Sequence, residues 1–262
     1  MRAIASGRWA TAAAVTVAWL SIAGAVYAPS LAAPEEPART TPALLRTTVP
    51  VLLVPGWLDT ARELAALRIR LSAAGWPDVE TLSFADPTGG NRQHAAEIDS
   101  VVTEMLERTG APEIDIVAHS MGGLATRWYL KTHPSAPVRK VVFMASPHRG
   151  TLSAVLAWGK GSDEMLPTSD FLDALNEGPA LPPGVEAMTI RTLLDTHIFP
   201  AESATLPGVP DRSVCCPTHA GMLHDEEVFR LVSEFLDESG ATTVTTSDAT
   251  AGPAPGTTPI AR

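Results

Sequence analysis

The chain has 262 residues, of which 45% are hydrophobic and 18% charged, a composition that excludes disorder throughout its length and is typical of a packed globular protein. Its formal net charge is −10 at pH 7, and the sequence contains no cluster of Lys or Arg. Such a chain is a poor partner for nucleic acid or for anionic lipid.

Residues 1–32 have the pattern of a secretory signal peptide. Arg2 and Arg8 precede an uncharged run of apolar and small residues, and small residues before Ala33 offer a cleavage site. An earlier cut after Ala28 is disfavoured by the proline that would follow it. We expect a protein that is secreted after cleavage, with an uncleaved membrane anchor as the alternative.

Two further segments lack the periodicity of folded elements. Residues 33–48 are rich in Pro, Glu and Thr and are predicted to be a flexible linker. Residues 241–262 are rich in Thr, Ala, Pro and Gly and are predicted to be a disordered tail. Residues 49–240 are therefore expected to form a single folded domain.

Within this domain, strand-like and helix-like patterns alternate. Short apolar runs predict buried parallel strands, and apolar residues spaced three or four apart predict amphipathic helices. The predicted strands span residues 49–54, 79–84, 114–118, 138–145 and 187–194, and the predicted helices span residues 61–74, 93–108, 122–131, 169–176 and 226–238. This order predicts an α/β fold with a mostly parallel sheet and helices on both faces. Reactive groups are then expected at the carboxyl ends of the strands.

One such strand end combines an apolar run, a serine and the start of a helix. Ser120 has the small residues Ala118 and Gly122 two positions away on either side. A strand that turns directly into a helix strains its central residue, and small neighbours let the two backbones approach. The pattern predicts Ser120 as an exposed nucleophile, and the alternative is an ordinary helix N-cap.

These residues resemble the nucleophile elbow of the α/β-hydrolase superfamily, in the Ala-His-Ser-Met-Gly form of small secreted bacterial lipases. Residues 146–151, Ser-Pro-His-Arg-Gly-Thr, are similar to the loop after the following strand in the same lipases. With Pro-Gly-Trp at residues 55–57 and a late His loop, the resemblance spans most of residues 49–238. It implies an α/β-hydrolase fold and the hydrolysis of acyl esters, without specifying the acyl group.

A serine nucleophile needs a base, and the base needs a carboxylate to orient it. The superfamily order is serine, acid, histidine. His148 precedes any suitable acid, which leaves His197, His219 and His224. His219 lies in Thr-His-Ala-Gly-Met-Leu, similar to the run around the family's catalytic histidine, whereas His224 fits the start of the last helix. We expect His219 to be the base.

Asp195 follows a predicted strand directly and is the expected acid. Asp211, in a loop rich in Pro and Gly, is the alternative. The other acidic candidates are disfavoured by chain order or by their position on predicted surface helices: Asp115, Asp163, Asp170 and Asp173.

The tetrahedral intermediate needs hydrogen-bond donors for its oxyanion. One is the backbone N–H of Met121, at the start of the helix after Ser120. The resemblance assigns the other to the N–H of Trp57, although Pro55 stands where lipases carry a histidine.

Apolar residues are frequent in the loops expected to border this site, and they suit an acyl chain, whose burial contributes about 0.8 kcal/mol per methylene. They are Trp57, Leu58, Leu152, Leu156, Trp158, Met165, Leu166, Ile198, Phe199, Met222 and Leu223. The segment between Thr151 and the next predicted strand is too short for a full cap domain, so we expect a minimal cap.

The only cysteines, Cys215 and Cys216, are adjacent, which excludes a long-range disulfide within a monomer and leaves buried thiols or a vicinal disulfide. The sequence lacks a phosphate loop, a dinucleotide-binding fingerprint and a paired-histidine metal motif. We therefore expect no cofactor and no metal.

The sequence as a whole predicts a secreted serine carboxylesterase or lipase that works through Ser120, Asp195 and His219 and an acyl-enzyme intermediate. Its expected partner is an acyl ester or lipid, with transient contact to a lipid interface, and we expect a monomer that does not bind nucleic acid. The alternatives are an acyltransferase or thioesterase with the same triad, and a catalytically silent binding module.

Overall fold

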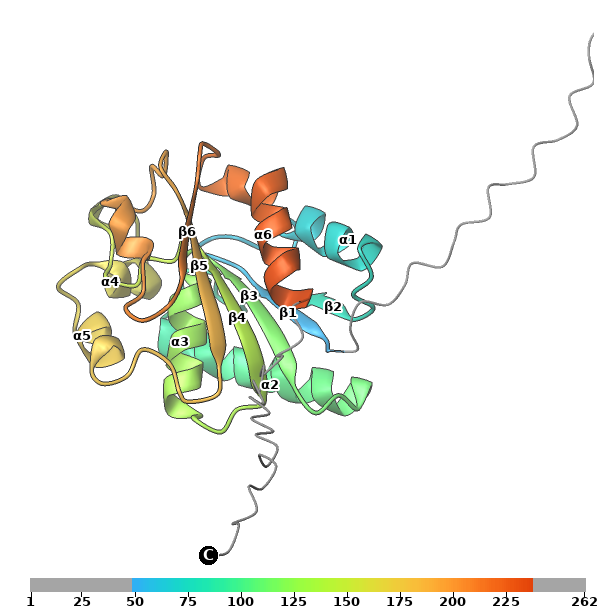
Figure 1. Cartoon of the computed structure of the whole chain (residues 1–262). Coiled ribbons are helices and arrows are strands. Elements are labelled where there is room, and N and C mark those ends of the chain that lie inside the picture. The colour runs from blue at the N-terminus through green and yellow to red at the C-terminus, as the bar shows by residue number, and fades with distance from the viewer. Residues whose placement is uncertain (1–48, 238–262) are drawn as a thin grey trace, which may run out of the picture. The chain divides into compact units, whose positions relative to one another are not determined.

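The computed structural model describes residues 49–237, and these residues contain one six-stranded sheet. The strand order is β2-β1-β3-β4-β5-β6, and every neighbouring pair is parallel (Figure 1). The strands are β1 (Val51–Val54), β2 (Val79–Thr81), β3 (Ile114–His119), β4 (Val138–Met144), β5 (Glu186–Thr192) and β6 (Asp211–Val214).

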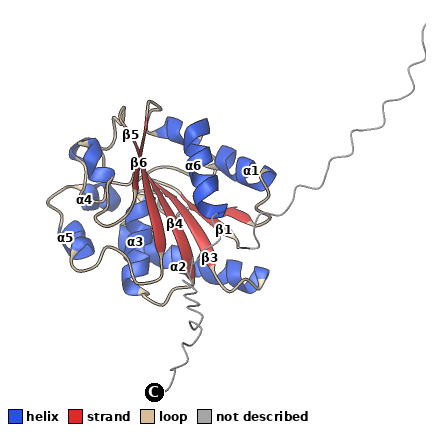
Figure 2. Cartoon of the chain, viewed as in Figure 1, coloured by secondary structure: helices blue, strands red, loops and turns tan. Residues whose placement is uncertain are grey.

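Helices cover both faces of this sheet, which confirms the predicted fold class (Figure 2). One face is covered by α1 (Ala65–Ala73) and α6 (Glu226–Asp237), and the other by α2 (Asn91–Thr109) and α3 (Gly122–Thr132). Parallel strands that are buried on both faces have nearly continuous apolar sequences, so the central strands could be predicted from the sequence.

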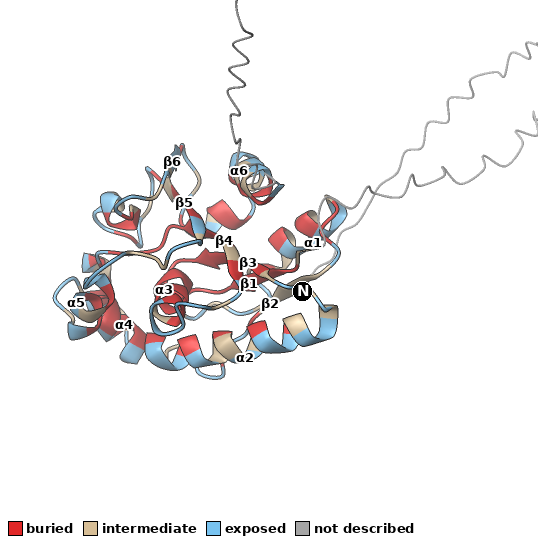
Figure 3. Ribbon diagram, turned by 60° about the horizontal axis from the view of Figure 1, so that its bottom comes forward, coloured by how far each residue is buried: buried red, intermediate tan, exposed pale blue. Residues whose placement is uncertain are grey.

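Side chains alternate between the two cores along each strand. Val51 and Leu53 pack with the helices α1 and α6, whereas Leu52 and Val54 pack with α2 and α3. Figure 3 shows buried residues on the strands and on the sheet-facing sides of the helices, while α2 exposes its outer side.

Three short elements lie between β4 and β5. They are the 3₁₀ helix η1 (Leu152–Leu156), α4 (Lys160–Met165) and α5 (Asp170–Asn176). Their apolar side chains, among them Met165 and Phe171, pack on Met121 and Leu124 at the start of α3 in a third, smaller core. This segment is a small flap over the end of the sheet, as expected for a minimal cap.

Several predicted boundaries were wrong. The first helix begins at Ala65 and not at residue 61, because the Glu63 carboxylate accepts hydrogen bonds from the N–H and the hydroxyl of Thr60 and holds a turn there. The second strand, β2, ends at Thr81, although the buried Phe84 beyond it made the apolar run look longer.

The fifth predicted strand ends at Thr192 and not at residue 194, since the Thr192 hydroxyl accepts the N–H of Leu194 and donates to the carbonyl of Pro217. The sequence prediction also missed α4, the 3₁₀ helices and the edge strand β6, which was treated as loop. In β6 only Val214 is buried, so the strand carries little apolar signal.

The predicted signal peptide, the linker and the C-terminal tail lie outside the described residues. Among residues 49–237, no helix combines the length and the apolar character that crossing a membrane requires.

Candidate active site

The strand-to-helix turn at Ser120 has the strained geometry that its sequence predicts. β3 ends at His119, Ser120 has a backbone φ of +52°, and α3 begins at Gly122. Positive φ is uncommon for a residue other than glycine, and such strain is found mainly at functional sites. The turn therefore presents a serine at the carboxyl edge of the sheet.

Small residues around the turn allow close contact with β1. A Cβ atom at Gly122 would lie 2.3 Å from the carbonyl oxygen of Pro55, and one at Gly56 would lie 2.8 Å from Cβ of Ser120. The loop after β1 thus packs directly against the nucleophile turn. This loop, residues 55–59, is called the oxyanion loop below, because it carries the predicted donor of Trp57.

The second predicted donor, the N–H of Met121, belongs to the first turn of α3, whose leading N–H groups have no partner within the helix. Trp57 lies on the wall of the same cavity as Ser120. Both positions fit the predicted oxyanion donors, and their role stays a prediction.

Asp195 and His219 come together although 24 residues separate them. Nδ1 of His219 lies 2.9 Å from Oδ2 of Asp195, and both side chains are more than nine-tenths buried. The other carboxylate oxygen, Oδ1, accepts the backbone N–H groups of His197 and Ile198 at 2.8 Å each. The acid is therefore fixed by its own loop and holds one nitrogen of the imidazole.

The surroundings set the charge of this pair. Burial lowers the pKa of His219 below its ordinary value, and the hydrogen bond to Asp195 offsets only part of that effect. Burial raises the pKa of Asp195, but the hydrogen bond and charge of His219, with two backbone N–H groups, outweigh it and leave the pKa below its ordinary value. At neutral pH the pair is a neutral imidazole held by a carboxylate, as a general base requires.

The alternative residues have other partners. Asp211 accepts a hydrogen bond from Thr189 and pairs with Arg191 at the edge of the sheet. His224 is exposed and ends the 3₁₀ helix η3 (Ala220–Leu223). His148 is fully buried, and burial lowers its pKa well below the ordinary value, which suits a structural residue.

The remaining acidic candidates also lie elsewhere. Asp115 is fully buried beside Arg139, and Asp163, Asp170 and Asp173 lie on α4 and α5.

A cavity of about 410 Å³ opens at this edge of the sheet, and Ser120 and His219 both lie on its wall. Its apolar lining includes Trp57, Leu58, Ala154, Leu156, Ala157, Met165, Ile198 and Ala220. Met222 and Leu223 were wrongly expected here. They follow His219 in η3, which turns them into the core between the sheet and α6.

Comparison with known proteins agrees with this fold. A family model described as the alpha/beta hydrolase fold matches residues 70–182. Lipase B of Aspergillus fumigatus superimposes with a TM-score of 0.67 and 22% identity, over 73% of this chain and 53% of that one. The mature lipase BlEst2 of Bacillus licheniformis gives a TM-score of 0.57 and 15% identity, over 74% of this chain and 93% of that one. The chain has the α/β-hydrolase fold.

A triacylglycerol lipase of Burkholderia plantarii is 28% identical over 156 residues, which cover 53% of this chain and 41% of that lipase. The chain thus spans less than half of this curated relative. The resemblance to the α/β-hydrolase superfamily is confirmed, whereas the narrower likeness to small secreted bacterial lipases stays a prediction.

Three polar neighbours of the site had no role assigned from the sequence, apart from His197 as a candidate base. Asp59 and His119 form a hydrogen bond on the cavity wall, and the ring of His197 stacks on that of His219 with centroids 4.7 Å apart. His119 stands inside the elbow motif and was readable as a neighbour of Ser120. Asp59 carried no sequence signal, because only the folded loop brings it to the site. His197 was a candidate base in the sequence, but Asp195 pairs with His219 and the ring of His197 stacks on that histidine.

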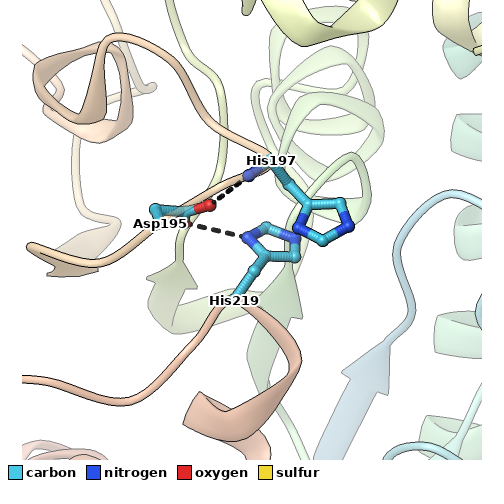
Figure 4. Close-up of side chains that lie close together, drawn as sticks. All are labelled: Asp195, His197 and His219. Carbon is cyan, nitrogen blue, oxygen red and sulfur yellow. Dashed lines mark hydrogen bonds and ion pairs between the residues drawn. The ribbon is translucent and has the colours of Figure 1, made fainter. Parts of the chain in front are cut away.

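Asp195, His197 and His219 form one group, among the residues described, that could hold a metal ion, with one ligand atom of each within 4.8 Å of the others (Figure 4). Both oxygens of Asp195 already accept hydrogen bonds, one from His219 and one from two backbone N–H groups. A cation bound by all three side chains would have to displace these bonds, so the donor set fits an acid–base pair better than a metal centre.

Cys215 and Cys216 form a vicinal disulfide in the loop between β6 and His219. Both residues are exposed, so the alternative of buried thiols does not describe them.

Proposed function

We propose that this chain is a serine hydrolase of carboxylic esters. The proposal rests on the presence of Ser120 and His219 on the wall of one cavity. Ser120 lies on a strained turn, and Nδ1 of His219 lies 2.9 Å from Oδ2 of Asp195. Solved structures that share the fold include a lipase and a carboxyl esterase, which supports ester hydrolysis.

In this mechanism the Ser120 hydroxyl attacks the ester carbonyl carbon while His219 takes its proton. The N–H groups of Trp57 and Met121 stabilise the negative oxygen of the tetrahedral intermediate. His219 then protonates the leaving alcohol, which leaves the acyl group on Ser120. A water molecule, deprotonated by His219, attacks this acyl-enzyme and releases the carboxylic acid, and the proton returns to Ser120. Asp195 orients His219 throughout.

The test compares Ser120→Ala with Ser100→Ala, an exposed serine on α2. Hydrolysis of p-nitrophenyl butyrate and labelling by a fluorophosphonate should both vanish in Ser120→Ala and persist in Ser100→Ala. A series of p-nitrophenyl esters from two to sixteen carbons then defines the acyl range. Labelling that survives in Ser120→Ala would place the nucleophile elsewhere, and transfer to an added alcohol faster than to water would favour an acyltransferase.

Exposed apolar side chains border the cavity and support transient docking on a lipid surface. Trp158 is 62% exposed, and its ring packs edge-on to Trp57 with centroids 4.9 Å apart. The N–H of Leu152 donates to the carbonyl of Phe199 at 2.9 Å, which joins the flap to the loop after β5. The rim consists of Leu58, Leu152, Val155, Leu156, Trp158 and Phe199. Since the chain carries a net charge of −10, the surface we propose is neutral lipid.

Two exposed rim residues outside the cavity lining, Leu152 and Val155, allow a test that leaves the site itself intact. The double variant Leu152→Ser/Val155→Ser should hydrolyse emulsified tributyrin more slowly and leave the rate on soluble p-nitrophenyl acetate unchanged. Ile69, 60% exposed on α1, is the matched control, and Ile69→Ser should alter neither rate. Equal losses on the emulsion and on the soluble ester would argue against docking.

We also propose that the protein is exported and loses residues 1–32, on the sequence pattern described above. The intact mass of the protein recovered from the culture medium should correspond to a chain that begins at Ala33. A cell-associated protein of full-length mass would support the membrane anchor.

A further inference from the structure

A second carboxylate–imidazole pair lies beside the one formed by Asp195 and His219. Nδ1 of His119 lies 3.0 Å from Oδ2 of Asp59, and both residues contribute to the cavity wall. The His119 side chain is 2% exposed and that of Asp59 is 25% exposed. The mechanism proposed above gives this buried pair no role.

Asp59 ties the pair to the oxyanion loop. The same oxygen, Oδ2, accepts the backbone N–H of Gly56 at 3.3 Å, and the N–H of Asp59 donates to the carbonyl of Gly56. Gly56 precedes Trp57, which carries the predicted oxyanion donor. The Asp59 carboxylate therefore fixes the turn that aims this N–H group.

His119 ties the pair to the loop of the catalytic histidine. Its second ring nitrogen, Nε2, lies 3.3 Å from the backbone carbonyl oxygen of His219, and the two rings are 4.7 Å apart. His119 also directly precedes Ser120, so a single side chain joins the elbow, the oxyanion loop and the loop of His219.

We propose that Asp59 and His119 are positioning residues that hold the oxyanion donor and the catalytic histidine in register on either side of Ser120. The inference rests on the proposed ester hydrolysis. Neither side chain needs to touch the reacting atoms, since both act through Gly56, Trp57 and His219. Because a misplacement of about 1 Å can cost about 100-fold in rate, loss of the pair should lower kcat and leave KM unchanged.

The first test is Asp59→Ala with p-nitrophenyl butyrate. We expect kcat to fall about 100-fold at constant KM. Asp59→Asn retains an accepting oxygen, so its kcat should be at least tenfold higher than that of Asp59→Ala. Asp78→Ala is the control. Asp78 precedes β2 and forms an ion pair with Arg108, and its loss should leave kcat unchanged. A wild-type kcat in Asp59→Ala, or no recovery in Asp59→Asn, would overturn the proposal.

The second test is a double-mutant cycle. Residues that act as a unit are non-additive, so Asp59→Ala/His119→Gln should lose about as much kcat as either single variant. Losses that multiply would show two independent effects and overturn the pair. Failure of the proposed function is separately visible, because wild-type protein would then hydrolyse no ester and take up no fluorophosphonate at Ser120.

Discussion

The variant Gly122→Ala should show how strongly the close packing of the Ser120 turn affects kcat and how strongly it affects the free energy of unfolding. An added Cβ would lie 2.3 Å from the carbonyl oxygen of Pro55 and 2.9 Å from that of Val54. Both atoms belong to the backbone of β1 and the loop after it, so no rotamer change can relieve the contact. The elbow and the oxyanion loop must therefore move apart.

The size of this movement sets two expected magnitudes. Restoring an ordinary contact requires about 1 Å of separation, and overpacking of this kind costs about 1–3 kcal/mol of unfolding free energy. The same 1 Å shifts Ser120 relative to the N–H of Trp57, which should lower kcat about 100-fold, or about 2.7 kcal/mol of activation free energy.

Gly110→Ala is the matched control. Gly110 ends α2 with a φ of +69°, and no atom lies within 4 Å of the position its Cβ would take. This substitution should cost about 1–2 kcal/mol through backbone strain alone. Urea denaturation and kcat on p-nitrophenyl butyrate, measured on both variants, test the reasoning. Gly122→Ala with a wild-type kcat, or Gly110→Ala with an equally reduced one, would refute it.

Two further variants test the Asp195–His219 pair and the ion pair between Arg139 and Asp115. Asp195→Asn should lower kcat by about 10⁴-fold, because the imidazole of His219 loses its orienting carboxylate. In the wild type, kcat/KM should fall on acidification with a midpoint below pH 6.5, because burial lowers the pKa of His219. In Asp195→Asn this midpoint should move to a lower pH, because Asp195 raises the pKa of His219. A wild-type midpoint above pH 6.5 would contradict this reasoning. Arg139→Leu should lower the unfolding free energy at pH 7 by about 3–5 kcal/mol, because it leaves the buried Asp115 unpaired. Burial already raises the pKa of Asp115, so the folded state takes up a proton at a higher pH than the unfolded state does. Because protonation removes the unpaired charge, the difference in unfolding free energy between wild type and Arg139→Leu, measured by urea denaturation, should shrink toward acidic pH.

The elbow was predictable because its constraints are local. A strand that meets a helix at a serine restricts the residues two positions away, so Ala118, Ser120 and Gly122 could be read without knowledge of the fold. Asp195 and His219 were predictable for a different reason. The superfamily fixes the order of the triad along the chain, and few residues satisfied that order.

The rest of the site depends on contacts that sequence order does not encode. Asp59 lies 60 residues from His119, and its role becomes visible only when the oxyanion loop packs on the elbow. The edge strand β6 was missed because exposed polar residues dominate it. Met222 and Leu223 were placed in the cavity because apolarity alone does not say toward which side of η3 a side chain points.

The motif at residues 146–151, in the loop after β4, contributes to the site through Thr151. β4 lies between β3, which leads to Ser120, and β5, which leads to Asp195, so the loop after β4 starts beside the loop that carries Asp195. The hydroxyl of Thr151 joins the two loops, since it donates to the carbonyl of His197 and accepts the N–H of Phe199, each at 2.8 Å. Thr151 ends the motif at residues 146–151, and these two bonds give that motif a structural role, because they fix the loop whose Asp195 carboxylate holds the imidazole of His219.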